Sequence, residues 1–548
     1  MSEAEIVAAV SDTAPILPGD ADGNGNAIAL DTPVTRTSST TLIKRVFSFP
    51  ALLGALLVAG MATVARTFFV DPDVWWHIKF GQVILATHHW PTNDIYSFSV
   101  AGKPWIDAEW IGELLLATVY RLGGMRGLEL YLLILGSSIL VALYTLATVR
   151  SGNSKAGFVV TVAVFMLATA SFNLRPQMLG YLFLILTLIA LERFRQGKQS
   201  IIWAIPMLMV VWVNAHPSWT IGLGVIGIYL ASGLVEFRMG DVEAKRWSPA
   251  ERSKLAGVLA LSACATLVTP YGAGLAKFPF AFAFSLPVSI ANIREWLPMP
   301  FGDLLGKMFL VTMFSVIALQ LANQVKWHLQ DITLFIFATV EACLHRRFIL
   351  ILVPIFTMIL ADVLTRWVPR YERTKDQVLI NAALMTVILL IVIRYLPSQT
   401  TLWQTAGNTY PVAAAEYLNS HSIPGPMYNT YNFGGYLILS RGPEHKVFLD
   451  GRSELYEPAG VLVDYFEIAA VKPNALAALQ KYGFQSCLLQ HNEGLATLLA
   501  ASPDWQKVYE DETSILFVRR GASPVAGIQN SVGTQTSLLQ EKSKEDQP

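Results

Sequence analysis

The sequence predicts a polytopic α-helical membrane protein with about eleven transmembrane helices, a large first outer loop and a small C-terminal α/β domain. Three observations lead to this fold class. Of the 548 residues, 53% are hydrophobic and only 15% are charged, whereas soluble proteins carry about 25% charged residues. Apolar runs near the roughly 20 residues that cross a bilayer recur along the chain. After Tyr410 these runs shorten and turn residues become more frequent.

Composition also excludes several function classes. The formal net charge is +0 and no basic tract is interleaved with aromatic residues, so nucleic acid is not an expected partner. The cysteines Cys264, Cys343 and Cys487 lie far apart and predict neither a disulfide framework nor a Cys/His metal site. Phosphate-loop, dinucleotide and zinc-protease motifs are absent, which excludes cytosolic nucleotide chemistry.

Residues 1–41 are rich in Ser, Thr, Asp, Gly and Ala, and we expect a disordered cytoplasmic tail. This segment lacks the basic start and early apolar core of a cleavable signal peptide, so the first apolar run should remain as an anchor. Residues 42–400 form the predicted transmembrane domain. Its crossings are expected at about 46–65, 128–149, 156–173, 177–194, 200–215, 219–237, 255–272, 304–324, 329–343, 347–365 and 378–396, with a further or re-entrant piece at 278–291.

Basic residues predict the orientation of these crossings. Clusters of Lys and Arg before the first span and after the second, fourth, sixth, eighth and tenth spans all fall on one side, which the positive-inside rule makes cytoplasmic. The opposite side then carries the loop 66–127 and everything after Tyr395. We therefore expect a multi-pass protein of the inner (plasma) membrane with a cytoplasmic N-terminus and a periplasmic or extracellular C-terminal domain.

The first outer loop, 66–127, is too long for a simple connection. Its apolar residues from Trp76 to Thr87 mark one helical face and predict a short helix lying in the membrane interface. A second helix should begin near Trp110, run to Arg121 and end at Gly123-Gly124 before the next crossing.

The segment 407–520 predicts the outer-face α/β domain, followed by a disordered tail over 521–548. Strands are expected at 426–431, 446–449, 486–490 and 514–518, and helices at 411–420, 459–470, 475–482 and 495–501. Within this segment, Asp450-Gly451-Arg452 has two interpretations. It is either a working surface or a turn that an Asp450–Arg452 pair holds in place.

The first outer loop also carries a cluster of polar side chains. Asp71 and Asp73 could share a divalent cation such as Mg or Mn, or one of them could act as a general base. Alternatively, Asp73 only caps the helix that follows it. His77 lies one turn later and is a candidate metal ligand, proton carrier or hydrogen-bonded interface residue. We predict catalytic roles for Asp73, Asp71 and His77.

Arginines on the predicted outer side form a second group of candidates. Positive charge is rare in short translocated loops, so Arg175, Arg294, Arg346 and Arg347 call for an explanation. The functional interpretation is that these planar guanidinium groups bind a donor phosphate. The alternative is contact with lipid headgroups or pairing with Glu295, Glu341 or the loop aspartates.

Further candidates for acceptor or sugar contacts are Glu109, His216, Trp76 and Trp296. His216 could equally be an ordinary polar group at a helix end. An aromatic belt at the membrane interface also explains most of the tryptophans, and we expect Trp75 and Trp76 to serve mainly as interface anchors.

Several motifs carry a family resemblance. They are Asp71-x-Asp73-x-Trp75-Trp76-His77-Ile78-x-x-Gly81, Pro91-x-x-Asp94, Trp105-x-x-x-Glu109-Trp110, Asn214-x-His216, Arg294-Glu295-Trp296, Arg346-Arg347 and Asn432-Phe433-Gly434-Gly435-Tyr436-Leu437. Over residues 46–520 the chain resembles bacterial GT-C-type integral membrane glycosyltransferase-like proteins. The resemblance implies a cell-envelope enzyme, embedded in membrane lipid, that transfers a sugar from a polyprenyl-phosphate donor to a glycan, lipid or protein acceptor on the outer face. It implies that Asp73, with Asp71, activates the acceptor or holds a metal, while the outward arginines neutralise the leaving phosphate.

Two other function classes remain open at this point. A transporter or flippase of a lipid-linked or anionic substrate would favour charges inside the spans and an internal repeat, and neither is evident. A non-catalytic polysaccharide assembly protein could use the same scaffold, with Asp450-Gly451-Arg452 as its binding surface.

Overall fold

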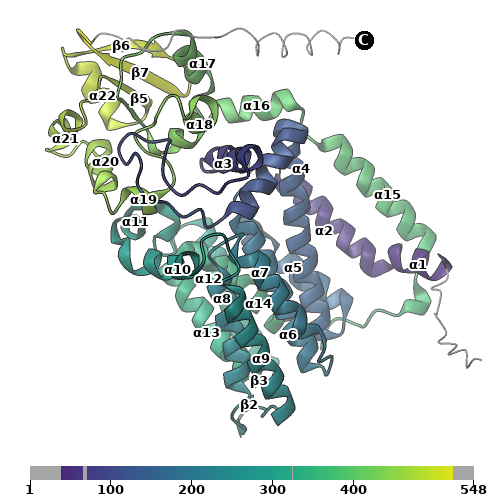
Figure 1. Ribbon diagram of the computed structural model, residues 1–548. Coiled ribbons are helices and arrows are strands. Elements are labelled where there is room, and N and C mark those ends of the chain that lie inside the picture. The colour runs from purple at the N-terminus through teal and green to yellow at the C-terminus, as the bar shows by residue number, and fades with distance from the viewer. Residues whose placement is uncertain (1–38, 66–70, 324, 523–548) are drawn as a thin grey trace, which may run out of the picture. The chain divides into compact units, whose positions relative to one another are not determined.

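The computed structural model describes residues 39–65, 71–323 and 325–522, and these are mainly helical (Figure 1). Most of the two predicted terminal tails, 1–38 and 523–548, lies outside the described residues. Helix α1, Ser39–Val46, belongs to a compact unit separate from the one that begins at Phe47. Lys44 and Arg45 lie in its last turn, where positive charge suits the helix dipole. The predicted tail therefore ends with the start of a helix at Ser39.

Each predicted crossing contains one apolar helix of the second unit. These helices are α2 (Phe49–Ala65), α4 (Trp110–Ser151), α5 (Ser154–Thr169), α6 (Gln177–Arg195), α7 (Ala204–Val213), α8 (Trp219–Ser232), α9 (Pro249–Ala265), α12 (Leu304–Asn323), α13 (Leu329–Leu344), α14 (Ile349–Leu364) and α15 (Val378–Tyr395). Among the described residues, five helical segments are long and apolar enough to cross a membrane: 110–151, 177–195, 304–323, 346–364 and 378–395. The total of eleven crossings stays a prediction.

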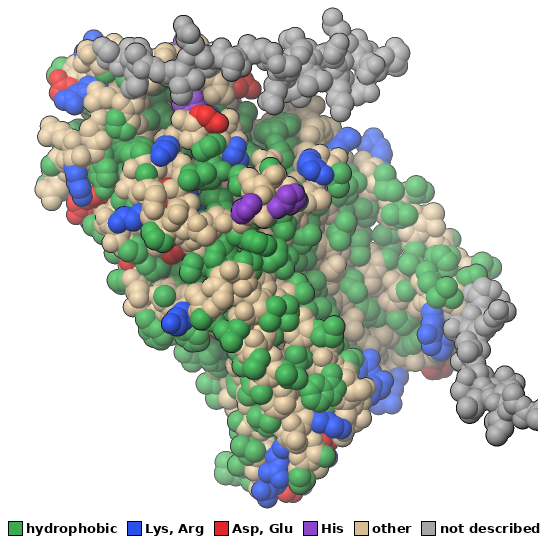
Figure 2. Space-filling view, in the orientation of Figure 1, with side chains coloured by type: hydrophobic (Ala, Val, Ile, Leu, Met, Phe, Trp, Pro, Cys, Tyr) green, Lys and Arg blue, Asp and Glu red, His purple; other side chains and the backbone are tan. Residues whose placement is uncertain are grey.

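The helices divide into buried and surface members. Helix α14 is buried along nearly its whole length and packs against α4, α5, α12 and α13. On α15, by contrast, apolar side chains such as Leu379, Leu389 and Leu390 are exposed. Figure 2 shows hydrophobic side chains spread over the surface of the helices, with Lys and Arg gathered at the end that carries β2 (Val242–Ala244). An apolar surface of this size suits contact with lipid rather than water.

The first outer loop folds against the protein. Helix α3 runs over Val74–Thr87 and is packed between α4 and the C-terminal segment, with most of its residues buried. The predicted short helix is therefore present, and its position in the membrane interface stays a prediction. Helix α4 begins at Trp110 as expected. Its helical geometry is broken at Gly124, whose φ is 55°, so the first helical segment ends at the two glycines as predicted and a second segment runs on to Ser151.

Shorter elements connect the apolar helices. A small sheet of order β1-β2-β3 joins β1 (Phe237–Met239), β2 and β3 (Trp327–His328). The region predicted as an extra or re-entrant piece contains α10 (Ala273–Ser285) and α11 (Pro287–Asn292).

The C-terminal segment combines helices with a four-stranded sheet of order β4-β5-β7-β6. Strand β4 pairs parallel to β5, whereas β5–β7 and β7–β6 are antiparallel, with Cys487 opposite Phe517 and Leu488 opposite Leu516. The elements in order are α16 (Gln399–Gly407), α17 (Val412–Ser420), β4 (Met427–Asn429), α18 (Tyr431–Arg441), α19 (Ser453–Tyr456), α20 (Val461–Ala469), α21 (Ala475–Lys481), β5 (Ser486–Gln490), α22 (Gly494–Ala501), β6 (Trp505–Glu510) and β7 (Ser514–Arg519).

The predicted strand at 446–449 is wrong. Val447 makes only an isolated parallel bridge to Ser97 of the first outer loop. The backbone groups next to Val447 form hydrogen bonds with a side chain instead of a strand. The Asn429 side chain accepts from the amide of Phe448 at 2.8 Å and donates to the carbonyl of Leu449 at 2.9 Å. Strand β6, with exposed Gln506 and Lys507, was not predicted.

Two glycines of α18 allow close backbone packing, Gly435 against the first outer loop and Gly434 within the C-terminal segment. A Cβ at Gly435 would lie 2.4 Å from the carbonyl oxygen of Pro72, and one at Gly434 would lie 2.1 Å from that of Leu449. Only glycine fits at such separations. Helix α18 therefore rests directly on the start of α3, next to the acidic cluster.

Candidate functional site

A cavity of about 1030 Å³ lies where the first outer loop, the loops between the apolar helices and the C-terminal segment meet. Every residue that the sequence singled out as catalytic, phosphate-binding or sugar-contacting lines it. These are Asp71, Asp73, Trp76, His77, Glu109, Arg175, His216, Arg294, Trp296, Arg346 and Arg347. The structure thus brings together side chains from six separate stretches of sequence, while the role of each one stays a prediction.

Asp73 pairs with Arg175 rather than capping α3. Its Oδ2 lies 2.8 Å from the Arg175 guanidinium, and its side chain makes no capping hydrogen bond. Asp71 accepts from Arg175 Nε at 2.6 Å and from Asn173 Nδ2 at 2.9 Å. The Asp73 amide donates to Asp71 Oδ1 at 2.9 Å, which fixes the turn before the helix. The capping interpretation of Asp73 is therefore wrong, and both aspartates converge on one arginine.

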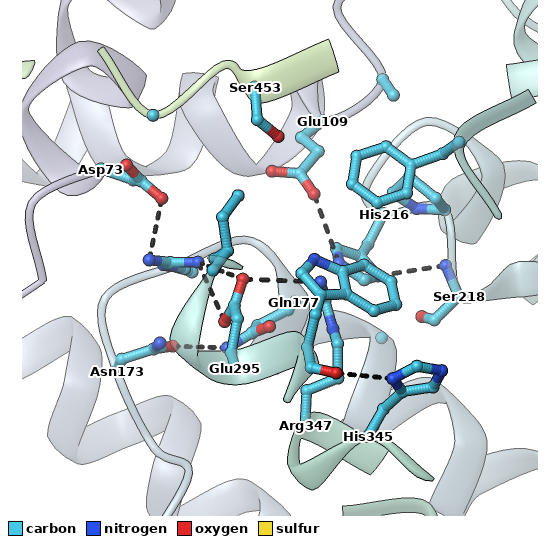
Figure 3. Close-up of a pocket in the computed structure, with 18 of the residues that line it drawn as sticks. Asp73, Glu109, Asn173, Gln177, His216, Ser218, Glu295, His345, Arg347 and Ser453 are labelled. Carbon is cyan, nitrogen blue, oxygen red and sulfur yellow. Dashed lines mark hydrogen bonds and ion pairs between the residues drawn. The ribbon is translucent and has the colours of Figure 1, made fainter. Parts of the chain in front are cut away.

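Glu295 joins the two arginine groups. It lies 3.1 Å from Arg175 and 3.5 Å from Arg347, so the pairing with Glu295 raised as an alternative is present (Figure 3). The Arg347 guanidinium also lies 4.1 Å from the ring centroid of Trp296, a cation–π contact that orients it. Arg346 and Arg294 line the same cavity, and no ion pair is recorded for either within the described chain.

A second cluster surrounds Glu109. His77 Nδ1 lies 3.0 Å from Glu113, and His77 Nε2 lies 3.6 Å from Glu109. His216 Nδ1 accepts a hydrogen bond from the Ser218 amide at 3.1 Å, so a neutral His216 carries its proton on Nε2. That nitrogen lies 3.3 Å from Glu109 Oε1 (Figure 3).

Burial changes the protonation of these groups. It raises the pKa of Asp73 to about 7, an effect that Arg175 only partly offsets. Burial also raises the pKa of Glu109 to about 8. It lowers the pKa of His216 to about 3, and the charge of Arg347 adds to this. For Glu295, burial would raise the pKa, but Arg175 and Arg347 outweigh it and lower the pKa to about 2. The cavity therefore holds two carboxyl groups that exchange protons near neutral pH.

The tryptophan pair is not an interface anchor. Trp75 is fully buried, stacks on Trp403 of α16 at 6.2 Å and meets the rings of Tyr410 and Tyr436 edge-on. Trp76 is 7% exposed and lines the cavity beside His77. The C-terminal segment covers both indoles, which a local hydropathy pattern cannot reveal.

The Asp450-Gly451-Arg452 turn fixes the C-terminal segment against the loop. Arg452 is buried and lies 2.6 Å from Asp450 and 2.9 Å from Asp94 of the first outer loop. Its guanidinium also lies 5.0 Å from the ring of Phe80 and 5.2 Å from that of Trp105. The interpretation that an Asp450–Arg452 pair holds the turn in place is confirmed. A working surface in this region would therefore consist of the residues beside this pair.

The predicted Mg or Mn site does not fit this arrangement. The Arg175 guanidinium occupies the position between Asp71 and Asp73 that a shared cation would need. Within the described ranges, no three His, Cys, Asp or Glu side chains are grouped as metal ligands.

Sequence reasoning missed several lining or supporting residues. Glu113 lies one helical turn after Glu109, so the i, i+4 spacing could have indicated it. The sequence indicated Glu295 only as a partner for an arginine, not as a residue that lines the cavity. Ser453 and Tyr431 line the cavity from the C-terminal segment, and no local pattern links them to the first outer loop.

Comparison by sequence finds no matching family model and no matching curated protein. Comparison of structures does find relatives. The chain is similar to ArnT from Cupriavidus metallidurans bound to undecaprenyl phosphate, with a TM-score of 0.51, 14% identity, and coverage of 90% of this chain and 100% of that one. The chain has the GT-C glycosyltransferase fold. With its long apolar helices, the GT-C fold makes this a membrane-embedded protein.

The chain is also similar to two further solved structures. An Archaeoglobus fulgidus oligosaccharyltransferase matches with a TM-score of 0.47 and 10% identity, over 80% of this chain and 69% of that one. The mycobacterial arabinofuranosyltransferase AftD matches with a TM-score of 0.49 and 13% identity, over 85% of this chain and 41% of that one.

Proposed function

We propose that this protein is a membrane glycosyltransferase that moves a sugar from a polyprenyl-phosphate donor to an acceptor on the outer face of the membrane. One observation carries the proposal: Asp73 and Arg347 line a single cavity and are linked through Arg175 and Glu295. Transfer from a phosphate-linked donor needs a base and an anion-binding group side by side. The similarity to ArnT, described with bound undecaprenyl phosphate, supports the lipid-phosphate donor.

The proposed reaction is a single displacement with inversion at the sugar. The acceptor oxygen attacks the anomeric carbon while the bond from that carbon to the phosphate oxygen breaks. The bonding electron pair leaves with the phosphate, and the acceptor proton passes to the Asp73 carboxylate. The raised pKa of Asp73, about 7, suits a group that must take up a proton near neutral pH.

The arginines stabilise the leaving group in this scheme. Arg347 is held by Trp296 and Glu295 at the cavity wall, and Arg346 and Arg294 add positive charge close by. Guanidinium groups fixed before the reaction stabilise charge as it develops on the phosphate. Arg175 binds Asp71 and Asp73 instead, so we assign it to positioning the two aspartates.

The membrane placement is part of the same proposal. The basic loops lie on the cytoplasmic side of the plasma membrane, and the cavity with the C-terminal segment 407–520 lies outside. The apolar helices supply about eleven crossings between 42 and 400, and lipid surrounds them.

Deleting the gene and comparing all envelope glycans and glycolipids tests this function. We expect one glycan, lipid or glycoprotein to lose a sugar that the wild-type gene restores and the Asp73→Asn gene does not. Unchanged glycans, together with substrate uptake into sealed vesicles without any covalent product, would instead support a transporter.

A further inference from the structure

The cavity has two walls of different chemistry. The first wall carries Arg175, Arg294, Arg346 and Arg347, all from loops between the apolar helices. The second, here called the C-terminal wall, consists of Tyr431, Asn432, Gly451, Ser453, Glu454, Tyr465 and Phe466. In the part of the chain that the structure describes, no Lys or Arg lines the cavity from this wall. A phosphate would therefore meet cations on one side only.

The C-terminal wall presents polar groups without partners. Ser453 is 3% exposed, and its hydroxyl makes no hydrogen bond with any described residue. Figure 3 shows Ser453 between Asp73 and Glu109, with its hydroxyl on the side of the Glu109 carboxyl group. The exposed side chain of Asn432 lines the same cavity, likewise without a hydrogen bond inside the described ranges. Both groups are therefore available to a ligand, which must replace the hydrogen bonds to any water that it displaces.

Two tyrosines give this wall an aromatic surface. The rings of Tyr431 and Tyr465 lie 6.0 Å apart at 44°, and both residues line the cavity. Their positions are fixed, because the Tyr431 hydroxyl donates to the Gly451 carbonyl at 3.2 Å and the Tyr431 amide donates to the Tyr465 hydroxyl at 3.2 Å. A rigid aromatic surface beside hydroxyl and amide groups suits a ligand with both apolar faces and hydroxyls.

Asp73 stands between the two walls. Its Oδ2 faces Arg175 at 2.8 Å, whereas its Oδ1 faces the C-terminal wall. A Cβ on Gly451 would lie 1.8 Å from Oδ1, so only glycine leaves room for this carboxylate. The oxygen that is not bound to arginine is thus directed to the wall that carries Ser453 and Tyr431.

We propose that the C-terminal wall binds the acceptor, and that the acceptor is an uncharged saccharide whose hydroxyl reacts. An anionic acceptor would meet the carboxyl group of Glu454 on this wall, which supplies no Lys or Arg among the described residues to balance the charge. An ammonium group would be attracted but has no lone pair with which to attack the sugar. The transfer step rests on the proposed function, whereas saccharide binding to this wall can be measured independently of it.

Saturation-transfer NMR on the full-length chain in detergent tests the proposal. The probes are neutral methyl hexopyranosides and pentofuranosides, each compared with its sugar phosphate, which the arginines of the first wall can also bind. We expect at least one neutral glycoside to bind, and its signal, unlike that of the phosphate, to depend on the C-terminal wall. The double variant Ser453→Ala and Asn432→Ala should reduce the saturation signal at least fivefold. The matched control Ser440→Ala, whose hydroxyl bonds within α18, should leave the signal unchanged.

Three results would overturn the proposal. They are the binding of no neutral glycoside, an unchanged glycoside signal in the double variant, and an equal loss of signal in the control Ser440→Ala. Because no donor is present, none of these results depends on sugar transfer. Conversely, glycoside binding without any transfer from polyprenyl-phosphate sugars would contradict the proposed function. It would not contradict the proposal that the C-terminal wall binds a saccharide.

Discussion

Arg175 and Asp73 form an ion pair of 2.8 Å between the loop before α6 and the start of α3. The same guanidinium reaches Asp71 at 2.6 Å and Glu295 at 3.1 Å, so one arginine holds carboxylates from two other stretches of the chain. It fixes the Asp73 carboxylate in the cavity and leaves Oδ1 free of an arginine partner.

The rate of transfer should rise with pH through about 7. Burial raises the pKa of Asp73 to about 7, and only the deprotonated carboxylate can accept a proton. Arg175 lowers this pKa, so Arg175→Gln should raise the pKa further and move the midpoint to higher pH. Arg175→Lys, which keeps the charge, should shift the midpoint less. The measurement is kcat/KM from pH 5 to 10. A rate that falls through pH 7, or a midpoint that moves down in Arg175→Gln, would contradict the role of Asp73 as base.

Arg347 should contribute mainly to donor phosphate binding and leaving-group stabilisation. Loss of a charged hydrogen-bond donor costs roughly 1.5–3 kcal/mol, so Arg347→Ala should lower kcat/KM for the donor by about ten- to a hundredfold. Arg347→Lys should recover part of this loss, because it keeps the charge but not the planar contact with Trp296. Arg373→Ala, outside the cavity, serves as the control. Normal donor kinetics in Arg347→Ala would show that the arginine only pairs with Glu295.

His216 should remain neutral throughout the working pH range. Burial and the charge of Arg347 lower its pKa to about 3, and the Ser218 amide occupies Nδ1. We therefore expect nitrogen NMR to show a single tautomer, protonated at Nε2, from pH 5 to 9. A His216→Asn sample assigns the signal. Detection of an imidazolium between pH 5 and 7 would show that His216, and not only the carboxyl groups, exchanges protons in the site.

Arg150 should matter for stability rather than for transfer. It is buried and pairs with Glu192 at 3.2 Å, with Asp362 at 2.7 Å and with Asp331. Removing one partner from a buried ion cluster costs about 3–5 kcal/mol, because the remaining charges lose their compensation. Arg150→Ala should therefore lower the melting temperature in detergent, measured by fluorescence-detected gel filtration. The exposed Arg373→Ala should change it little, and an unchanged melting temperature in Arg150→Ala would contradict the assignment.

Much of the fold could be predicted from local pattern. Each predicted crossing contains a helix, because a run of apolar residues is visible without knowledge of its neighbours. The candidate residues also reach one cavity, because acidic and basic groups are conspicuous in so apolar a chain. The dense motif around Asp73 and the arginines at helix ends were therefore accessible to sequence reasoning.

The errors came from contacts between distant segments. The position of Asp73 predicted a helix cap, but its carboxylate forms an ion pair with Arg175 from another loop. Trp75 looked like an interface anchor, but α16 and α18 cover it. The segment 446–449 looked like a strand, but the side chain of Asn429 satisfies its backbone. In each case a tertiary partner outweighs the local preference, and the spacing of residues along the chain does not show that partner.

The central claim is that Asp73 takes the acceptor proton during sugar transfer. The most direct measurement follows a radiolabelled sugar from a polyprenyl-phosphate donor into covalent product, with purified wild-type protein, Asp73→Asn and the control Asp241→Asn. Since general-base catalysis contributes about a hundredfold or more, Asp73→Asn should lose at least that factor while its melting temperature and donor binding are retained. Full transfer activity in Asp73→Asn would contradict the account.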